Sequence, residues 1–67
     1  MMHIKVNGER REISEGMTID ALLNILAIKR QGIAIDLNRE IVPKRLLGTT
    51  VLKEGDAVEI VRMVGGG

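Results

Sequence analysis

The sequence predicts an α+β domain in which a mixed sheet of four to five strands carries one helix across one face. Three observations indicate this class. Apolar residues alternate in segments near both ends of the chain, whereas one segment between them, residues 19–30, has the spacing of a helix. The 67 residues include 22 Ile, Leu and Val but no aromatic residue and no cysteine. Because no disulfide or thiolate-bound metal can stabilise so small a chain, it must bury an aliphatic layer between helix and sheet.

The first two strands are predicted to form a hairpin. Residues 3–6 alternate polar and apolar side chains, as expected of a strand with one buried face. Asn7-Gly8 is the strongest two-residue hairpin signal, because both positions tolerate the positive φ of a type I′ turn. The return strand, residues 9–14, has Ile13 as its single large apolar residue, which indicates a polar strand at a sheet edge.

A helix is predicted to follow. Thr18 is expected to be its N-cap, and Asp20 favours the positive end of the helix dipole. The apolar face comprises Ile19, Leu22, Leu23 and Leu26, widened by Ile25 and Ile28. Lys29 and Arg30 suit the last turn, and Gly32 is expected to end the helix.

The second half of the chain is predicted to return to strands. Residues 33–37 place alternate apolar side chains on one face, and Asn38-Arg39 turns the chain into a short strand, residues 40–42. That strand ends at Pro43, which cannot donate to a sheet ladder and belongs at an edge. Residues 44–50 are expected to form a loop or a single helical turn that tucks Leu46 and Leu47 under the sheet.

A turn at residues 54–56 precedes the last strand, residues 57–63. With the hairpin first and this strand last, the first and last strands are expected to lie side by side, which is the β-grasp arrangement. We therefore expect one β-grasp domain over residues 1–63 and a flexible glycine tail over residues 64–67.

Charge and hydropathy exclude several classes of partner. Ten basic and nine acidic residues are mixed along the chain, which gives a net charge of +1 and argues against a nucleic-acid-binding face. No apolar run reaches the roughly 20 residues that span a bilayer. Residues 1–6 lack the layout of a signal peptide, and a secreted domain of this size usually carries cysteines. We therefore expect a cytoplasmic protein with neither nucleic acid nor a membrane as its partner.

The chain ends in Val64-Gly65-Gly66-Gly67. Glycine loses more backbone freedom on ordering than any other residue, so these residues predict a thin thread that carries a free carboxylate. A terminal carboxylate ordinarily has a pKa of about 3.3–3.7, so it is ionised and nucleophilic at neutral pH. From the glycines alone, a reactive tail and a frayed terminus are equal alternatives.

The remaining residues supply no catalytic or metal-binding constellation. His3 has no second His and no Cys with which to share a metal. Asp36 and Glu40 are interpreted as surface charges rather than as a carboxylate pair. No base lies near three hydroxyl groups in the sequence, so none of them is predicted to act as a nucleophile. They belong to Ser14, Thr49 and Thr50.

Two stretches resemble the ThiS family of sulfur carrier proteins of thiamine biosynthesis. Asn38-Arg39-Glu40-Ile41-Val42-Pro43-Lys44 is similar to that family's Asn-x-x-Ile/Val-Val-Pro-Arg/Lys segment. Residues 54–61 and 64–67 are similar to its closing strand and tail. The resemblance covers nearly the whole chain. It departs at the end, where three glycines replace the family's minimal Gly-Gly.

The resemblance implies a ubiquitin-like carrier and co-substrate rather than an enzyme, with no cofactor or metal of its own. An E1-like adenylyltransferase (ThiF-like) would use ATP-Mg to adenylate the Gly67 carboxylate, with Gly65 and Gly66 as the tail. A persulfide supplied through a cysteine desulfurase would convert the adenylate to a thiocarboxylate, and thiazole synthase (ThiG-like) would take the sulfur. The alternatives are a carrier of the molybdopterin synthase or tRNA-thiolation type and, from another class, a non-covalent β-grasp binding module.

The last strand is the candidate docking surface for these partners. Val58 and Ile60 are predicted to face the helix, which leaves Val61 and Met63 exposed beside Val64 and the glycines. Contiguous exposed apolar area marks interaction sites, and Met adapts to more than one partner, although single exposed apolar residues are also normal. Three basic residues have two alternative interpretations: they steer an acidic partner surface, or they form a solvated rim. These residues are Arg62, Lys44 and Arg45.

Overall fold

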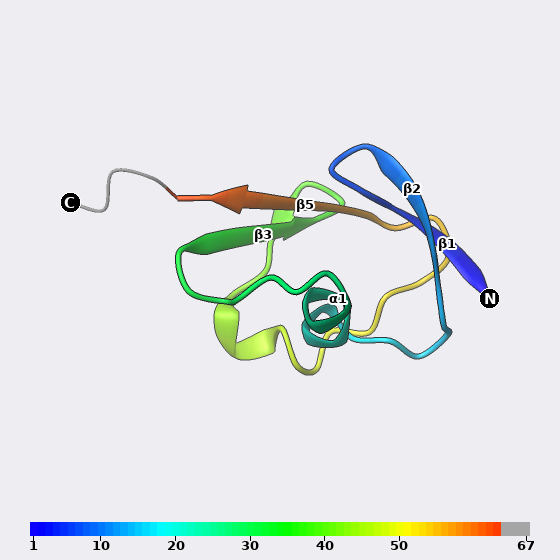
Figure 1. The fold of residues 1–67 in the computed structure, drawn as a ribbon, viewed down its shortest axis with the longest axis horizontal. Helices are drawn as coiled ribbons and strands as arrows, with labels where there is room; N and C mark the ends of the chain where they lie inside the picture. The colour runs from blue at the N-terminus through cyan, green and yellow to red at the C-terminus, as the bar shows by residue number, and fades with distance from the viewer. Residues whose placement is uncertain (64–67) are drawn as a thin grey trace.

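A computed structural model describes residues 1–63, and these residues form one sheet with a single α-helix across one face (Figure 1). The helix, α1, spans Ile19–Ile25, and a 3-10 helix, η1, spans Lys44–Leu46. The five strands are β1 (Met2–Val6), β2 (Glu9–Ile13), β3 (Ile33–Leu37), β4 (Glu40–Ile41) and β5 (Ala57–Arg62). The predicted fold class is confirmed.

The strand order across the sheet is β2-β1-β5-β3-β4. β1 and β5 run parallel, with Lys5 opposite Ala57 and Val6 opposite Val58, while the other neighbouring pairs are antiparallel. The first and last strands therefore lie side by side, as the element order predicted. The consequence for function is that β5, the strand nearest the chain end, lies at the centre of the sheet.

Both two-residue turns take the left-handed conformation that joins antiparallel strands. Asn7 and Gly8 have φ values of 51° and 83° between β1 and β2, which confirms the predicted type I′ geometry. Asn38 and Arg39 have φ values of 53° and 72° between β3 and β4. Arginine seldom adopts a positive φ, so this second turn carries a local conformational cost at Arg39.

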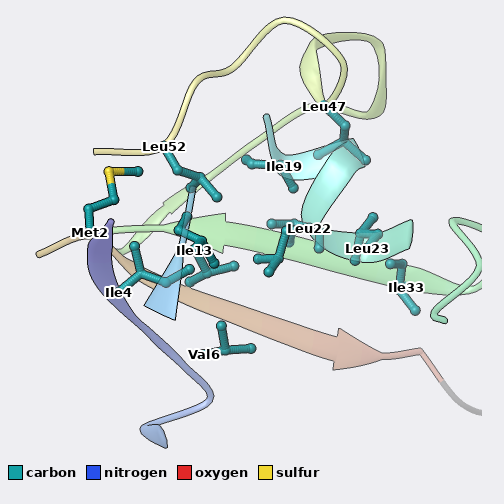
Figure 2. Close-up of a cluster of buried hydrophobic side chains, with 12 residues drawn as sticks. Met2, Ile4, Val6, Ile13, Ile19, Leu22, Leu23, Ile33, Leu47 and Leu52 are labelled. Carbon is teal, nitrogen blue, oxygen red and sulfur yellow. The ribbon is translucent and has the colours of Figure 1, made fainter. Parts of the chain in front are cut away.

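The core is an aliphatic layer between α1 and the sheet. Figure 2 shows Ile19, Leu22 and Leu23 of the helix directed toward strand residues such as Ile4 and Ile33. The buried residues are Met2, Ile4, Val6, Ile13, Ile19, Leu22, Leu23, Ile33, Ile35, Leu47, Leu52 and Val58. Within residues 1–63 no polar or charged residue is buried, so the burial of aliphatic surface stabilises the fold.

The start of α1 is capped as predicted. Thr18 Oγ1 accepts a hydrogen bond from Ala21 N at 3.2 Å. The first two amides of the helix donate to the segment after η1. Ile19 N donates to Thr50 O at 3.1 Å, and Asp20 N donates to Leu47 O at 3.0 Å. This segment therefore satisfies helix-terminal donors that would otherwise lack partners. It also buries the Leu47 side chain, which confirms the predicted single turn for Leu47, whereas Leu46 is only partly buried and does not join the core.

The end of α1 differs from the prediction, which extended the helix to Arg30 and a stop at Gly32. The helix ends at Ile25, and Ala27 takes a left-handed φ of 58°. Ala27 N donates to Asn24 O at 3.1 Å and Ile28 N to Leu23 O at 2.9 Å. These two bonds define a Schellman motif, in which a left-handed residue reverses the chain and satisfies the last carbonyls.

This early end explains why two isoleucines behave differently. At about 100° per residue, Ile28 would lie nearly opposite the buried face if the helix continued. The left-handed Ala27 instead returns Ile28 to the core, where it packs half-buried. Ile25 lies about 110° from the centre of the buried face and is 63% exposed, so the prediction that it widens that face is wrong. Within the described residues no helix is long and apolar enough to cross a membrane.

Candidate functional site

β5 leads directly to the segment that the sequence analysis singled out. Its partner β3 pairs with it from Val58 to Arg62. Beyond the strand, Met63 N donates to Gly32 O at 2.8 Å, so the backbone is held up to the last described residue. The residues predicted to carry the tail chemistry, Val64, Gly65, Gly66 and Gly67, lie outside the described residues.

The two faces of β5 have opposite character. Val58 is 1% exposed, and Ile60 packs against the core cluster. Val61 is 55% exposed and Met63, just after the strand, is 62% exposed. The predicted division of these four side chains between the helix and solvent is confirmed, while the docking role of the exposed pair stays a prediction.

Neighbouring strands extend this exposed apolar surface. Ala34 of β3 pairs with Val61, and Ile41 of β4, which pairs with Asp36, is 78% exposed. We call Ala34, Ile41, Val61 and Met63 the apolar patch. Beside it is a hollow of about 220 Å³ lined by Ile33, Ala34, Ile35, Ile41, Val42, Lys44, Leu47 and Met63. An apolar surface with a hollow can accept an apolar side chain from another protein.

The three basic residues proposed to steer a partner do not share one position. Lys44 lines the hollow beside the apolar patch. Arg62 pairs with the buried Ile33, so its side chain belongs to the helix side of the sheet rather than to the face of Val61. Arg45 is exposed on η1. Of these three residues, Lys44 is therefore the one that shares a hollow with residues of the apolar patch, and the steering role of all three stays a prediction.

Two asparagines hold β5 in place, a role that the sequence analysis missed. Asn38 Oδ1 accepts from Ala57 N at 3.0 Å, and Asn38 Nδ2 donates to Asp56 Oδ1 at 3.0 Å. Asn7 N donates to Val58 O at 2.9 Å, while Asn7 Oδ1 accepts from Ile60 N at 2.8 Å. Both residues were recognised as turn residues. Their hydrogen bonds to β5 could not be predicted without the sheet topology, because each bonding partner is distant in the sequence.

The other polar residues considered from sequence form no second site within residues 1–63. His3 Nε2 lies 3.5 Å from Glu12 Oε2, and no group of three or more potential metal ligands is present in this range. Thr50 Oγ1 donates to Leu46 O at 2.7 Å, so it serves the loop. In the β3–β4 hairpin Asp36 and Glu40 occupy adjacent positions of the ladder, on opposite faces, which agrees with their interpretation as separate surface charges.

Comparisons with known proteins agree with this geometry. A model of the ThiS family matches residues 4–67 of the chain. A sulfur carrier protein ThiS of Thermus thermophilus is 34% identical over 62 residues, with 92% of this chain and 95% of that protein covered. The crystal structure of a thiamine biosynthesis protein (ThiS) from Geobacter metallireducens superposes with a TM-score of 0.86 at 30% identity, covering 98% of this chain and 100% of that one.

A thiazole synthase of Paramagnetospirillum magneticum is 41% identical over 66 residues. The match covers 98% of this chain but 20% of that protein. The chain therefore spans about a fifth of the length of this relative, and the rest of the relative has no counterpart in it.

Proposed function

The chain belongs to the ThiS family of sulfur carriers in thiamine biosynthesis, and we propose that it carries sulfur as a thiocarboxylate on Gly67. In this proposal the folded body is a recognition handle and the glycine tail is the reacting group. The protein acts as a co-substrate of other enzymes and contributes no catalytic side chain.

The observation that supports this proposal best is the extent of the family match. It runs from residue 4 to residue 67, so it includes the terminal glycines as well as the fold. In the structure Met63, a member of the apolar patch, directly follows β5 and is the residue after which the tail begins in the sequence. A partner docked on the patch is thus close to the tail.

The proposed chemistry activates a group that is otherwise inert. An ionised carboxylate is a poor electrophile, so an E1-like adenylyltransferase (ThiF-like) first joins it to the α-phosphate of ATP and releases pyrophosphate. The terminal sulfur of a persulfide then attacks the acyl carbon and expels AMP. A thiol releases the thiocarboxylate by forming a disulfide with the inner sulfur of the persulfide. Glycine suits this path because it has no side chain to obstruct a narrow active site.

We propose thiazole synthase (ThiG-like) as the acceptor of the sulfur. The support is the relative named thiazole synthase, whose chain contains a segment similar to nearly all of this one. A carrier domain and an acceptor enzyme that must meet repeatedly gain from sharing one chain, because tethering raises their effective concentration.

Intact mass spectrometry tests the proposal. The protein is incubated with its adenylyltransferase, ATP-Mg and a sulfide source, and the expected product has one oxygen replaced by sulfur. A variant that lacks Gly66 and Gly67 no longer ends in two glycines and should gain no sulfur, although it keeps the complete folded body. Full-length protein that stays unmodified, beside a ThiS protein that the same mixture does convert, would contradict the proposal.

A further inference from the structure

The loop that joins α1 to β3, residues 26–32, ends beside the last described residue of the chain. Gly32, at the end of this loop, accepts through its carbonyl oxygen the hydrogen bond from Met63 N at 2.8 Å. Figure 1 shows the start of β3 and the end of β5 at the same end of the sheet, as their antiparallel register requires. Met63 is thus the last described position whose backbone is held, and the α1–β3 loop holds it.

The side chain of Arg30 ties the exposed part of this loop to the rest of the domain. Residues 29–32 are exposed, and within the described chain their backbone forms one hydrogen bond, the one from Met63. Arg30 Nη2 donates to Lys44 O at 2.6 Å, and Arg30 Nε lies 3.3 Å from Asp20 Oδ1. One guanidinium therefore connects the loop to η1 and to the first turn of α1.

These contacts suit arginine and add little to the stability of the whole fold. Asp20 Oδ1 is shielded from solvent and forms no hydrogen bond within residues 1–63, so the charge of Arg30 offsets its burial. A guanidinium reaches two acceptors from one planar fork, whereas an ammonium group is a single point charge. The side chains of Arg30 and Asp20 are 48% and 29% exposed, and ion pairs this exposed stabilise a protein only slightly.

We propose that Arg30 is a positioning residue for the tail, because it holds the α1–β3 loop where Gly32 O fixes the backbone of Met63. This inference rests on the proposed function, in which the carboxylate of Gly67 must reach the active site of an adenylating enzyme. The effective concentration of a chain end at its target falls roughly as the −3/2 power of the length of the connecting segment. Release of Arg62 and Met63 from β3 lengthens that segment from residues 64–67 to residues 62–67, which lowers this concentration about twofold.

Amide hydrogen exchange, followed by NMR, tests the structural part of the inference without a partner protein. Arg30→Met keeps an apolar stem but loses the charge and the donors, so the Met63 amide should exchange roughly tenfold faster than in the unmodified protein. The Ile60 amide, which donates to Asn7 Oδ1 at 2.8 Å, is the reference on the same strand and should change less. Arg30→Lys should give an intermediate rate, because an ammonium group can reach one of the two acceptors.

Adenylation kinetics at varied carrier concentration test the functional part. Arg30→Met should lower kcat roughly two- to fivefold, because the chain end is delivered less often and with poorer orientation. KM should stay nearly unchanged, because Arg30 lies outside the apolar patch. Ile13→Val is the matched control for lost stability. It removes a methylene group from a buried side chain of β2, which β1 separates from β5, so it should lower the melting temperature by roughly 2–8 °C and leave kcat unchanged.

Three results overturn the inference. In the first, the exchange of the Met63 amide relative to that of Ile60 is the same in Arg30→Met as in the unmodified protein. In the second, kcat falls no further in Arg30→Met than in Ile13→Val, and in the third only KM rises. If Arg30→Met does not fold, Arg30→Lys is judged by the same criteria. All three results can occur while the unmodified protein still gains sulfur, so they are distinguishable from failure of the proposed function.

Discussion

Ala27 ends α1 in a backbone conformation that suits glycine better than alanine. Its φ of 58° is left-handed, which costs an L-residue about 1–2 kcal/mol. Glycine removes this cost but adds freedom to the unfolded chain. We expect Ala27→Gly to raise the free energy of unfolding by about 0.5–1 kcal/mol in urea denaturation.

The same substitution within the helix is the control for Ala27. Ala21 lies inside α1, where glycine lowers stability by about 0.5–1 kcal/mol. Opposite signs at the two positions support the Schellman end at Ala27. A loss of stability at both would place residue 27 in the right-handed helix that the sequence alone predicted.

Val61 and Met63 are the residues on which docking by the apolar patch can be tested. Both are more than half exposed, so Val61→Asp and Met63→Asp should leave the melting temperature nearly unchanged. Each should lower the rate of adenylation by about tenfold or more at limiting carrier, because a carboxylate cannot be desolvated against an apolar partner without cost. The assay follows pyrophosphate release by the adenylating enzyme.

Ile25→Asp provides the comparison for these two variants. Ile25 is as exposed as Met63 but lies on α1, across the sheet from the apolar patch. It should therefore leave adenylation unchanged. If the variants at Val61 and Met63 unfold the protein, these side chains belong to the core rather than to a docking surface.

At the scale of the elements, Asn38 connects the β3–β4 turn to the start of β5. Asn38→Gly keeps the positive φ but loses two side-chain hydrogen bonds, the one that Ala57 N donates to Asn38 Oδ1 and the one that Asn38 Nδ2 donates to Asp56 Oδ1. Because these groups are exposed and water can replace the bonds, we expect a loss of about 1 kcal/mol in the free energy of unfolding. Chemical denaturation measures it.

Arg39→Gly is the neighbouring control for Asn38→Gly. Arg39 shares the positive φ, and its side chain forms no hydrogen bond with any residue in the range 1–63. It should leave stability unchanged or raise it slightly, since glycine relieves the left-handed conformation. Equal losses at both positions would mean that turn flexibility, not the link to β5, determines the effect.

These elements also show how far the sequence could predict the structure. Strands and turns were predictable because alternation and Asn-Gly chemistry act over a few residues. The end of α1 was not predictable, because no local sequence pattern marks an alanine that adopts a left-handed conformation. The conformation of Ala27 depends on the packing of Ile28 against the core.

In the candidate site, too, features set by local sequence were predictable and features set by long-range pairing were not. The exposed face of β5 was predictable from its own alternation. The contacts of Arg30 with Asp20 and Lys44 were not, because they join segments that are distant in the sequence.

At the scale of the whole molecule, the sheet order links the fold to the proposed function. β5 lies between β1 and β3 (Figure 1), so the strand that precedes the tail is fixed by neighbours on both sides. The core beneath it is aliphatic (Figure 2), and the opposite face carries the apolar patch. One side of the sheet thus stabilises the domain, and the other is the surface that we propose for docking a partner that acts on the chain end.

The measurement that tests the central claim most directly is the position of the transferred sulfur. The protein is converted with its adenylyltransferase, ATP-Mg and a sulfide source, and is then fragmented in a tandem mass spectrometer. The account predicts that the oxygen-to-sulfur mass change appears in the fragments that contain Gly67 and in no fragment confined to residues 1–63. The account would be contradicted if the oxygen-to-sulfur mass change lay within residues 1–63. It would also be contradicted if this mass change were absent from protein that the adenylating enzyme binds and turns over.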